Sequence, residues 1–151
     1  IIPMLKITKR NLPHWELPGS VYFVTFQLLT GVLYDDEIIL VKEHLVEGNN
    51  KFYTLHAAVV MNTHVHAIFR PAEGYTLSRI MKGMKGVSAN KLNHKRGTNG
   101  SVWQDESFDR ILRDEKEYIE KVQYMFNNPI KAGLTEDTWN YIGWYFNDEI
   151  E

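Results

Sequence analysis

Two histidines separated by one residue, His64 and His66, are the side chains whose types and spacing most clearly suit chemistry. The apolar runs on either side of them predict a strand, and side chains on a strand alternate between its two faces. Both imidazoles should therefore project from one face, about 7 Å apart along the chain. Two neutral imidazoles placed in this way can chelate a divalent metal ion when a third ligand converges on them. The alternative is a pair of exposed surface histidines, although a half-buried strand is a costly place for two imidazoles without a purpose.

A tyrosine and an asparagine four residues apart, Tyr124 and Asn128, form the second candidate. Residues at this spacing project to the same side of a helix. The tyrosine offers a phenolic nucleophile, and the amide oxygen of the asparagine can ligate a hard cation. Most helical tyrosines simply pack, so the spacing alone leaves a structural role for Tyr124 open.

Basic residues gather in one stretch of the chain. Between Gly74 and Gln104 there is no Asp or Glu, although the net charge of the whole sequence is −2. A local basic stripe can bind phosphate whatever the total charge, but a solvated helix face would have the same composition. The cations of this stretch are Arg79, Lys82, Lys85, Lys91, Lys95 and Arg96.

The composition excludes several classes of protein. Hydrophobic residues make up 44% of the 151 residues, which is typical of one globular domain. Cysteine is absent, so disulfides and thiolate metal sites are excluded. No apolar run reaches the ~18 residues of a transmembrane helix. The apolar stretch within the first ten residues is too short for a signal peptide. We therefore expect a cytoplasmic protein.

The candidate residues must be positioned by strands at 21–28, 51–61, 64–69 and 108–112 and by helices at 35–46, 76–93 and 115–127, with 102–103 joining the last strand. This order predicts an α+β, ferredoxin-like split βαβ fold with a four-stranded antiparallel sheet and helices on one face, plus a C-terminal helix that would be catalytic if Tyr124 is a nucleophile. Gly83 and Gly86 inside a helix indicate either a close backbone approach or a kink. Pro129 should end the last helix. The aromatic tail is expected to pack onto the domain rather than to stack on bases, and it comprises Trp139, Tyr141, Trp144, Tyr145 and Phe146.

Four sequence words occur in a single order and carry a resemblance to a known family. They are His64-Val65-His66, Val102-Trp103-Gln104-Asp105-Glu106, Phe108-Asp109-Arg110-Ile111-Leu112-Arg113-Asp114, and the segment from Tyr124 to Leu134. Lys85-Gly86 and Asn93 also match the pattern. From about Val21 to Leu134 the chain resembles the REP-associated tyrosine transposases, which are relatives of the small HUH-type, IS200-like single-tyrosine transposases. The family usually has Pro-Asn directly before the first histidine, where this chain has Asn62-Thr63.

The resemblance implies one transposase-like catalytic domain over residues 1–151, acting on single-stranded DNA with a hairpin. It implies that Tyr124 is the nucleophile and forms a 5′-phosphotyrosine intermediate. It implies that His64, His66 and Asn128 hold Mg²⁺ or Mn²⁺. Relatives act either as monomers or as homodimers, and the sequence does not decide between them. We expect DNA contacts from Lys82, Lys85, Lys91, Asn93, Lys95, Arg96, Arg110, Arg113 and Lys131.

Three other interpretations stay open at this point. A non-catalytic ferredoxin-like module would bind nucleic acid on aromatic residues of its sheet, without metal and without Tyr124. A metal-dependent nuclease would use water as the nucleophile and leave no protein–DNA adduct. A relative that serves the host cell would have the same chemistry as a mobile-element enzyme, and sequence does not separate those two.

Overall fold

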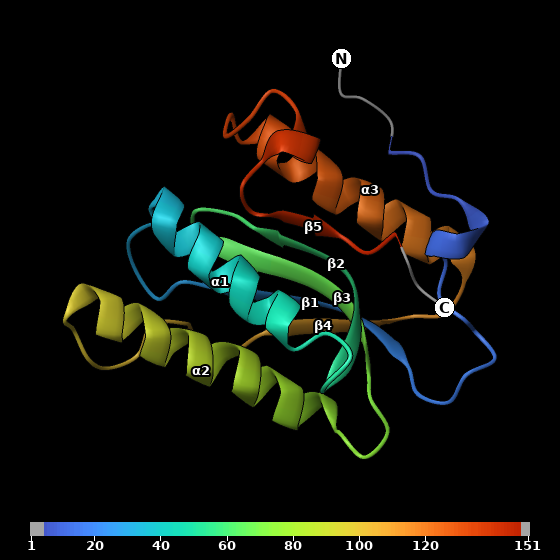
Figure 1. The fold of residues 1–151 in the computed structure, drawn as a ribbon, viewed down its shortest axis with the longest axis horizontal. Helices are drawn as coiled ribbons and strands as arrows, with labels where there is room; N and C mark the ends of the chain where they lie inside the picture. Colours follow the sequence, from blue (N-terminus) through green and yellow to red (C-terminus); the bar gives the residue numbers. More distant parts are fainter. Residues whose placement is uncertain (1–4, 149–151) are drawn as a thin grey trace.

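The computed structural model describes residues 5–148 and is built around a five-stranded antiparallel sheet (Figure 1). The strand order is β4-β1-β3-β2-β5, so the histidine-bearing strand β3 lies in the centre. The β2–β3 hairpin is closed at its turn by a hydrogen bond from the amide of Met61 to the carbonyl of His64 (2.8 Å). The strands are β1 (Val21–Gln27), β2 (Tyr53–Val60), β3 (His64–Pro71), β4 (Phe108–Leu112) and β5 (Trp144–Phe146).

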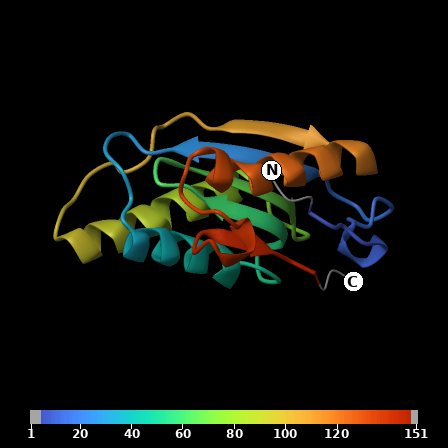
Figure 2. The same cartoon turned by 90° about the horizontal axis from the view of Figure 1, so that it is seen from above.

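Helices cover both faces of this sheet. Helices α1 (Asp35–Glu47) and α2 (Leu77–Arg96) lie on one face, and α3 (Glu115–Lys131) lies on the other (Figure 2). Strand β3 divides its side chains between the two cores: Val65, Ala67 and Phe69 belong to the core under α1 and α2, and Ile68 belongs to the core under α3. The predicted α+β, ferredoxin-like arrangement is confirmed, with the C-terminal helix on the second face.

The ends of the two long helices follow from capping residues. At the start of α2 the Thr76 hydroxyl accepts a hydrogen bond from the amide of Arg79 (3.2 Å), and at the start of α3 the Asp114 carboxylate accepts from the amide of Glu117 (2.9 Å). Helix α2 ends at Gly97, whose φ of 68° is the left-handed conformation that glycine adopts at little cost.

Helix α3 does not stop at Pro129 as the sequence predicted, but continues to Lys131. A proline removes only one backbone donor, and in the last turn few bonds remain to be lost. The turn is closed instead by hydrogen bonds from the amide of Ala132 to the carbonyl of Asn128 (3.0 Å) and from the amide of Leu134 to the carbonyl of Pro129 (2.9 Å).

The C-terminal segment packs onto the domain, as expected, and adds a strand that the sequence did not predict. Strand β5 pairs antiparallel with β2, and Tyr141 and Trp144 are buried in the core under α3. Trp103 lies outside β4 and forms an isolated bridge with Leu28. Over residues 5–148, the structure has no helix with the length and apolar character that a membrane span requires.

Candidate active site

The two histidines of β3 lie together under α3, at the centre of the sheet. Their ring centroids are 4.8 Å apart with the planes at 75°. His66 is 5% exposed and lies between Thr25 of β1 and Val59 of β2 in the strand register, whereas His64 is half-buried. The alternation that the sequence predicted thus puts both imidazoles on one face.

Hydroxyl groups hold one nitrogen of each imidazole. The Nδ1 atom of His66 lies 2.7 Å from the Thr25 hydroxyl, and the Nδ1 atom of His64 lies 2.9 Å from the Thr63 hydroxyl. Thr63, where the chain departs from the pattern that it resembles, thus supplies a partner for the first histidine. Hydrogen bonds at Nδ1 orient an imidazole and leave Nε2 for a metal ion.

The Nε2 atom of His66 is buried and has no hydrogen-bond partner among the described residues. A buried nitrogen without a partner is costly, so its environment calls for a ligand. Burial lowers the pKa of His66 to about 3, with smaller contributions from the positive charges of His64 and Lys121. Burial likewise lowers the pKa of His64, and the Asn128 side chain opposes both shifts. Both imidazoles are therefore neutral at neutral pH, the form that binds metal.

Helix α3 places Tyr124 against the histidine pair. The centroid of the Tyr124 ring lies 5.5 Å from that of His66, and the side chain is 47% exposed. One turn later the Asn128 side-chain amide donates a hydrogen bond to the carbonyl of Tyr124 (2.7 Å). This bond uses one of the two N–H donors of the amide and fixes its orientation, and the amide oxygen of Asn128 is the atom that can accept a hydrogen bond or ligate a cation.

The donor set fits a hard divalent cation with open coordination positions. No group of three or more His, Asp or Glu side chains that could hold a metal ion exists within residues 5–148. A third protein ligand beside the two histidines would therefore be the amide oxygen of Asn128, the residue that also influences the pKa of both rings. The structure brings together all four predicted site residues, and their chemical roles stay predictions.

Two further residues of this site were missed by the sequence analysis. Phe23 of β1 stacks on the His66 ring (5.5 Å between centroids, 18° between planes) and meets the Tyr124 ring edge-on at 6.4 Å. The Lys121 ammonium lies 5.0 Å from the centroid of Phe23 and 5.6 Å from that of Tyr124. Lys121 precedes Tyr124 by three residues, a helical spacing that could have revealed it. Phe23 is placed by strand pairing, which no local spacing shows.

The predicted DNA-binding cations are mostly engaged within the chain. Lys91 pairs with Glu47 (3.2 Å), Lys95 with Asp36 (3.0 Å), Arg96 with Glu37, and Arg110 with Glu117 (3.0 Å). The Lys85 ammonium donates to the carbonyls of Gln104 and Asp105 and to the Ser107 hydroxyl, and the Asn93 amide donates to the carbonyl of Gly100. Within the described part of the chain, no ion pair engages Lys82, Arg113 and Lys131.

The basic stretch of α2 lies on the opposite face of the sheet from the histidines (Figure 2). The helix that carries these cations is therefore separated from Tyr124 of the same chain by the sheet. Whether they bind DNA elsewhere stays a prediction.

Comparison with known proteins identifies a sequence family and a shared fold. The sequence model for IS200-like transposases matches residues 31–127. The structure of a REP-associated tyrosine transposase bound to a REP hairpin is similar over 86% of this chain and 79% of that chain, with a TM-score of 0.67 and 21% identity, which shows a shared fold. A proposed transposase from Deinococcus radiodurans gives a TM-score of 0.46 and 15% identity over 82% of this chain and 97% of its own. A comparison with curated protein sequences gave no match. Because the family match spans more than half of its length, the chain belongs to the IS200-like transposase family.

Proposed function

We propose that this transposase cleaves and rejoins single-stranded DNA through a covalent bond to Tyr124. The observation that carries the proposal is the position of the Tyr124 ring, 5.5 Å from a buried histidine whose Nε2 atom has no hydrogen-bond partner within residues 5–148. Metal-assisted phosphoryl transfer to a tyrosine needs a phenol close to metal ligands. This site offers a phenol, two neutral imidazoles and an amide oxygen.

His64, His66 and Asn128 would hold Mg²⁺ or Mn²⁺. When bound, the cation would offset the charge that develops on the phosphoryl oxygens. The chain's own residues prepare the site for it: Thr25 and Thr63 fix the imidazoles through Nδ1, and burial keeps both rings unprotonated.

In the cleavage step the Tyr124 Oη atom attacks the phosphorus of a phosphodiester. A bond forms between Oη and phosphorus, and the bond from phosphorus to the 3′-oxygen breaks. The phenolic proton is lost and the departing 3′-oxygen gains one, so the products are a 5′-phosphotyrosine and a free 3′-hydroxyl. Attack by a second 3′-hydroxyl reverses both changes and joins new strands. The exposure of Tyr124 leaves room for a strand to approach, and the Lys121 charge beside it suits a phosphate.

The proposed substrate is a single strand next to a hairpin. The similar REP-associated enzyme is bound to a REP hairpin, and the two chains share their fold over most of their lengths. Both the monomer and the homodimer stay compatible with this proposal.

A test uses Tyr124→Phe, Mn²⁺ and end-labelled hairpin DNA with single-stranded flanks. We expect the wild type to form a covalent adduct on a denaturing gel and the variant to form none. Tyr34→Phe is the matched control, because Tyr34 is exposed and far along the chain from α3. An adduct from the Tyr124 variant would refute the assignment of the nucleophile.

The same gel separates the other interpretations. Cleavage without any adduct would indicate a nuclease that uses water. Binding of DNA that a chelator leaves unchanged, without cleavage, would indicate a non-catalytic binding module.

A further inference from the structure

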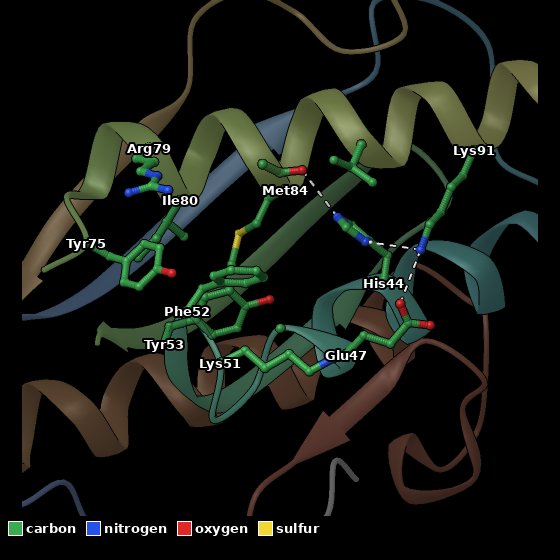
Figure 3. A pocket seen from close by; sticks show the side chains of 13 residues that line it. His44, Glu47, Lys51, Phe52, Tyr53, Tyr75, Arg79, Ile80, Met84 and Lys91 are labelled. Carbon is green, nitrogen blue, oxygen red and sulfur yellow. Dashed lines mark hydrogen bonds and ion pairs between the residues drawn. The ribbon is translucent and has the colours of Figure 1, made fainter. Parts of the chain in front are cut away.

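A pocket of about 370 Å³ opens between α1 and α2, on the face of the sheet opposite to Tyr124 (Figure 3). Its volume lies within the range of about 300–1,000 Å³ that is usual for small-ligand sites. Neither the histidine pair nor α3 contributes to it, so the proposed cleavage chemistry does not explain it.

The walls of the pocket are aromatic and apolar. Phe52 and Tyr75 meet edge-to-face at one end, with their ring centroids 5.4 Å apart, and the Arg79 guanidinium lies 4.7 Å above the Tyr75 ring. Phe52 is 45% exposed although it is a large apolar side chain. Ile80 and Met84 from α2 are buried beneath them. Aromatic rings with an exposed face suit a planar ligand.

The rim of the pocket is positively charged. Lys51, Arg79 and Lys91 line it together with a single carboxylate, Glu47, which pairs with Lys91 (3.2 Å). Figure 3 shows Arg79 at one end of the pocket and the Lys91–Glu47 pair at the other. The excess of positive charge favours an anionic ligand.

His44, the histidine that lines the pocket beside Lys91, is neutral. The His44 Nε2–H donates to the carbonyl of Gly83 (3.2 Å), so its Nδ1 atom has the lone pair that accepts from the Lys91 ammonium (3.4 Å). Burial, with a contribution from the charge of Lys91, lowers the pKa of His44 in agreement with this assignment. His44 thus ties α1 to α2 without adding charge to the site.

Gly83 of α2 lines the same pocket and has no steric reason to be glycine. A Cβ atom built there meets no atom of another element within 4 Å, so of the two alternatives that the sequence left open, a close backbone approach does not account for this glycine. Glycine inside a helix is unfavourable relative to alanine. Its effect at residue 83 is to leave the pocket open, because any side chain there would take up pocket space.

We propose that this pocket binds one unpaired nucleotide of a DNA strand. The base stacks on the exposed face of Phe52 and meets Tyr75 edge-on, and its phosphate lies beside Arg79 and Lys51. Stacking on aromatic rings next to cations is how proteins hold single-stranded nucleic acid without strict sequence preference. The inference takes DNA as the ligand from the proposed function, but it needs neither the metal nor Tyr124.

Cross-linking locates the nucleotide directly. The Tyr124→Phe protein, which cannot form the covalent adduct, is irradiated with a short oligothymidylate that carries a single 5-iododeoxyuridine. We expect mass spectrometry to find the cross-link in the peptides that contain Phe52 or Tyr75. Because this protein lacks the nucleophile, failure of the cleavage chemistry leaves the measurement intact.

Gly83→Leu blocks the pocket, and Gly86→Leu is the matched control. A Cβ atom at Gly86 also meets nothing within 4 Å, but this residue is exposed and lies outside the pocket. Both variants should keep the melting temperature of the parent or raise it, since leucine favours helix over glycine. We expect Gly83→Leu to abolish the cross-link and to weaken oligonucleotide binding about 5- to 100-fold, while Gly86→Leu changes neither.

Three results would overturn the inference: a cross-link in other peptides, equal effects of the two leucine variants, or free dAMP binding as tightly as the oligonucleotide. The last would assign the pocket to a soluble nucleotide instead of DNA. Arg79→Gln and Phe52→Ser are surface changes that provide a second measure, and unchanged oligonucleotide binding by both would also refute the proposal.

Discussion

The hydroxyl of Thr25 is the most informative single group to remove from the candidate active site. It lies 2.7 Å from the Nδ1 atom of His66, and within residues 5–148 the Nε2 atom of that ring has no hydrogen-bond partner. In Thr25→Val a methyl group replaces the hydroxyl with little change of shape, so the imidazole keeps its place but loses the bond that selects its tautomer.

Loss of this hydrogen bond should change two measurable quantities, the free energy of unfolding and the affinity for the metal ion. A buried Nδ1 atom without a partner should lower the free energy of unfolding by about 1–3 kcal/mol. Removing a hydrogen bond behind a metal ligand usually weakens metal affinity about 10- to 100-fold, or roughly 1.4–2.8 kcal/mol. We therefore expect Mn²⁺ binding, measured by calorimetric titration, and adduct formation to fall together, with saturating Mn²⁺ restoring part of the rate.

Two controls make this result specific. Thr25→Ser retains the hydroxyl and should bind Mn²⁺ almost as the wild type does. Thr54→Val makes the same chemical change on β2, the other strand that pairs with β3, away from the histidine pair. Wild-type Mn²⁺ affinity in Thr25→Val would show that His66 does not ligate the ion through Nε2, and the proposed metal site would have to be abandoned.

Three further changes test other parts of the structure. Burial lowers the pKa of His56 to about 3, with contributions from the charges of Arg70 and His14. Because the unfolded state binds its proton near the ordinary value of 6.5, stability is fully present above pH 6.5 and is lost as the pH falls toward 3. His56→Leu should therefore flatten the acid side of a stability–pH curve by on the order of a few kcal/mol, and an unchanged curve would refute the assignment. Lys121→Gln should slow adduct formation without changing Mn²⁺ affinity, and a parallel loss of both would show that it acts only through the fold. Asp114→Ala removes the N-cap of α3 and should cost about 1 kcal/mol of stability in a urea titration, whereas no change would mean that the cap is not formed in solution.

The residues of the candidate site that could be found from the sequence are those with local periodicity. Strand alternation places His64 and His66 on one face, and helical spacing places Asn128 one turn after Tyr124. These relations involve neighbours in the chain, so secondary structure alone fixes them. Phe23 joins the site from a strand more than forty residues away from His66 in sequence, by way of sheet pairing and the packing of α3. Such a contact depends on tertiary structure and has no local signal.

The charge pattern of the basic stretch also depends on tertiary contacts that the sequence does not show. Along the sequence, the cations of α2 stand apart from any acid and indicate a phosphate-binding surface. In the fold, α1 packs against α2 and brings Asp36, Glu37 and Glu47 to three of these cations. The Lys91 and Lys95 pairs join partly exposed side chains and contribute little to stability, whereas Glu37 in the Arg96 pair is buried. All three pairs reduce the free positive charge that DNA would meet. Lys82 has no such pair among the described residues and is the better candidate for a phosphate contact.

The alternation of β3 explains why one small sheet can support two separate sites. The histidines at 64 and 66 project toward α3, where a neutral, partly buried environment suits a metal ion and a phosphodiester. Val65, Ala67 and Phe69 project toward α1 and α2 and belong to the apolar core beneath the pocket between these helices. Tyr53, which lines the pocket, packs on Phe69 with 5.3 Å between the ring centroids. A polar residue in place of Val65 or Ala67 would disturb the core beneath the pocket, on the opposite face of the sheet from the histidines. Losing the histidines would leave that core intact. Variants of the two faces should therefore separate nucleotide binding at the pocket from cleavage at Tyr124, whereas a single continuous site would lose both together.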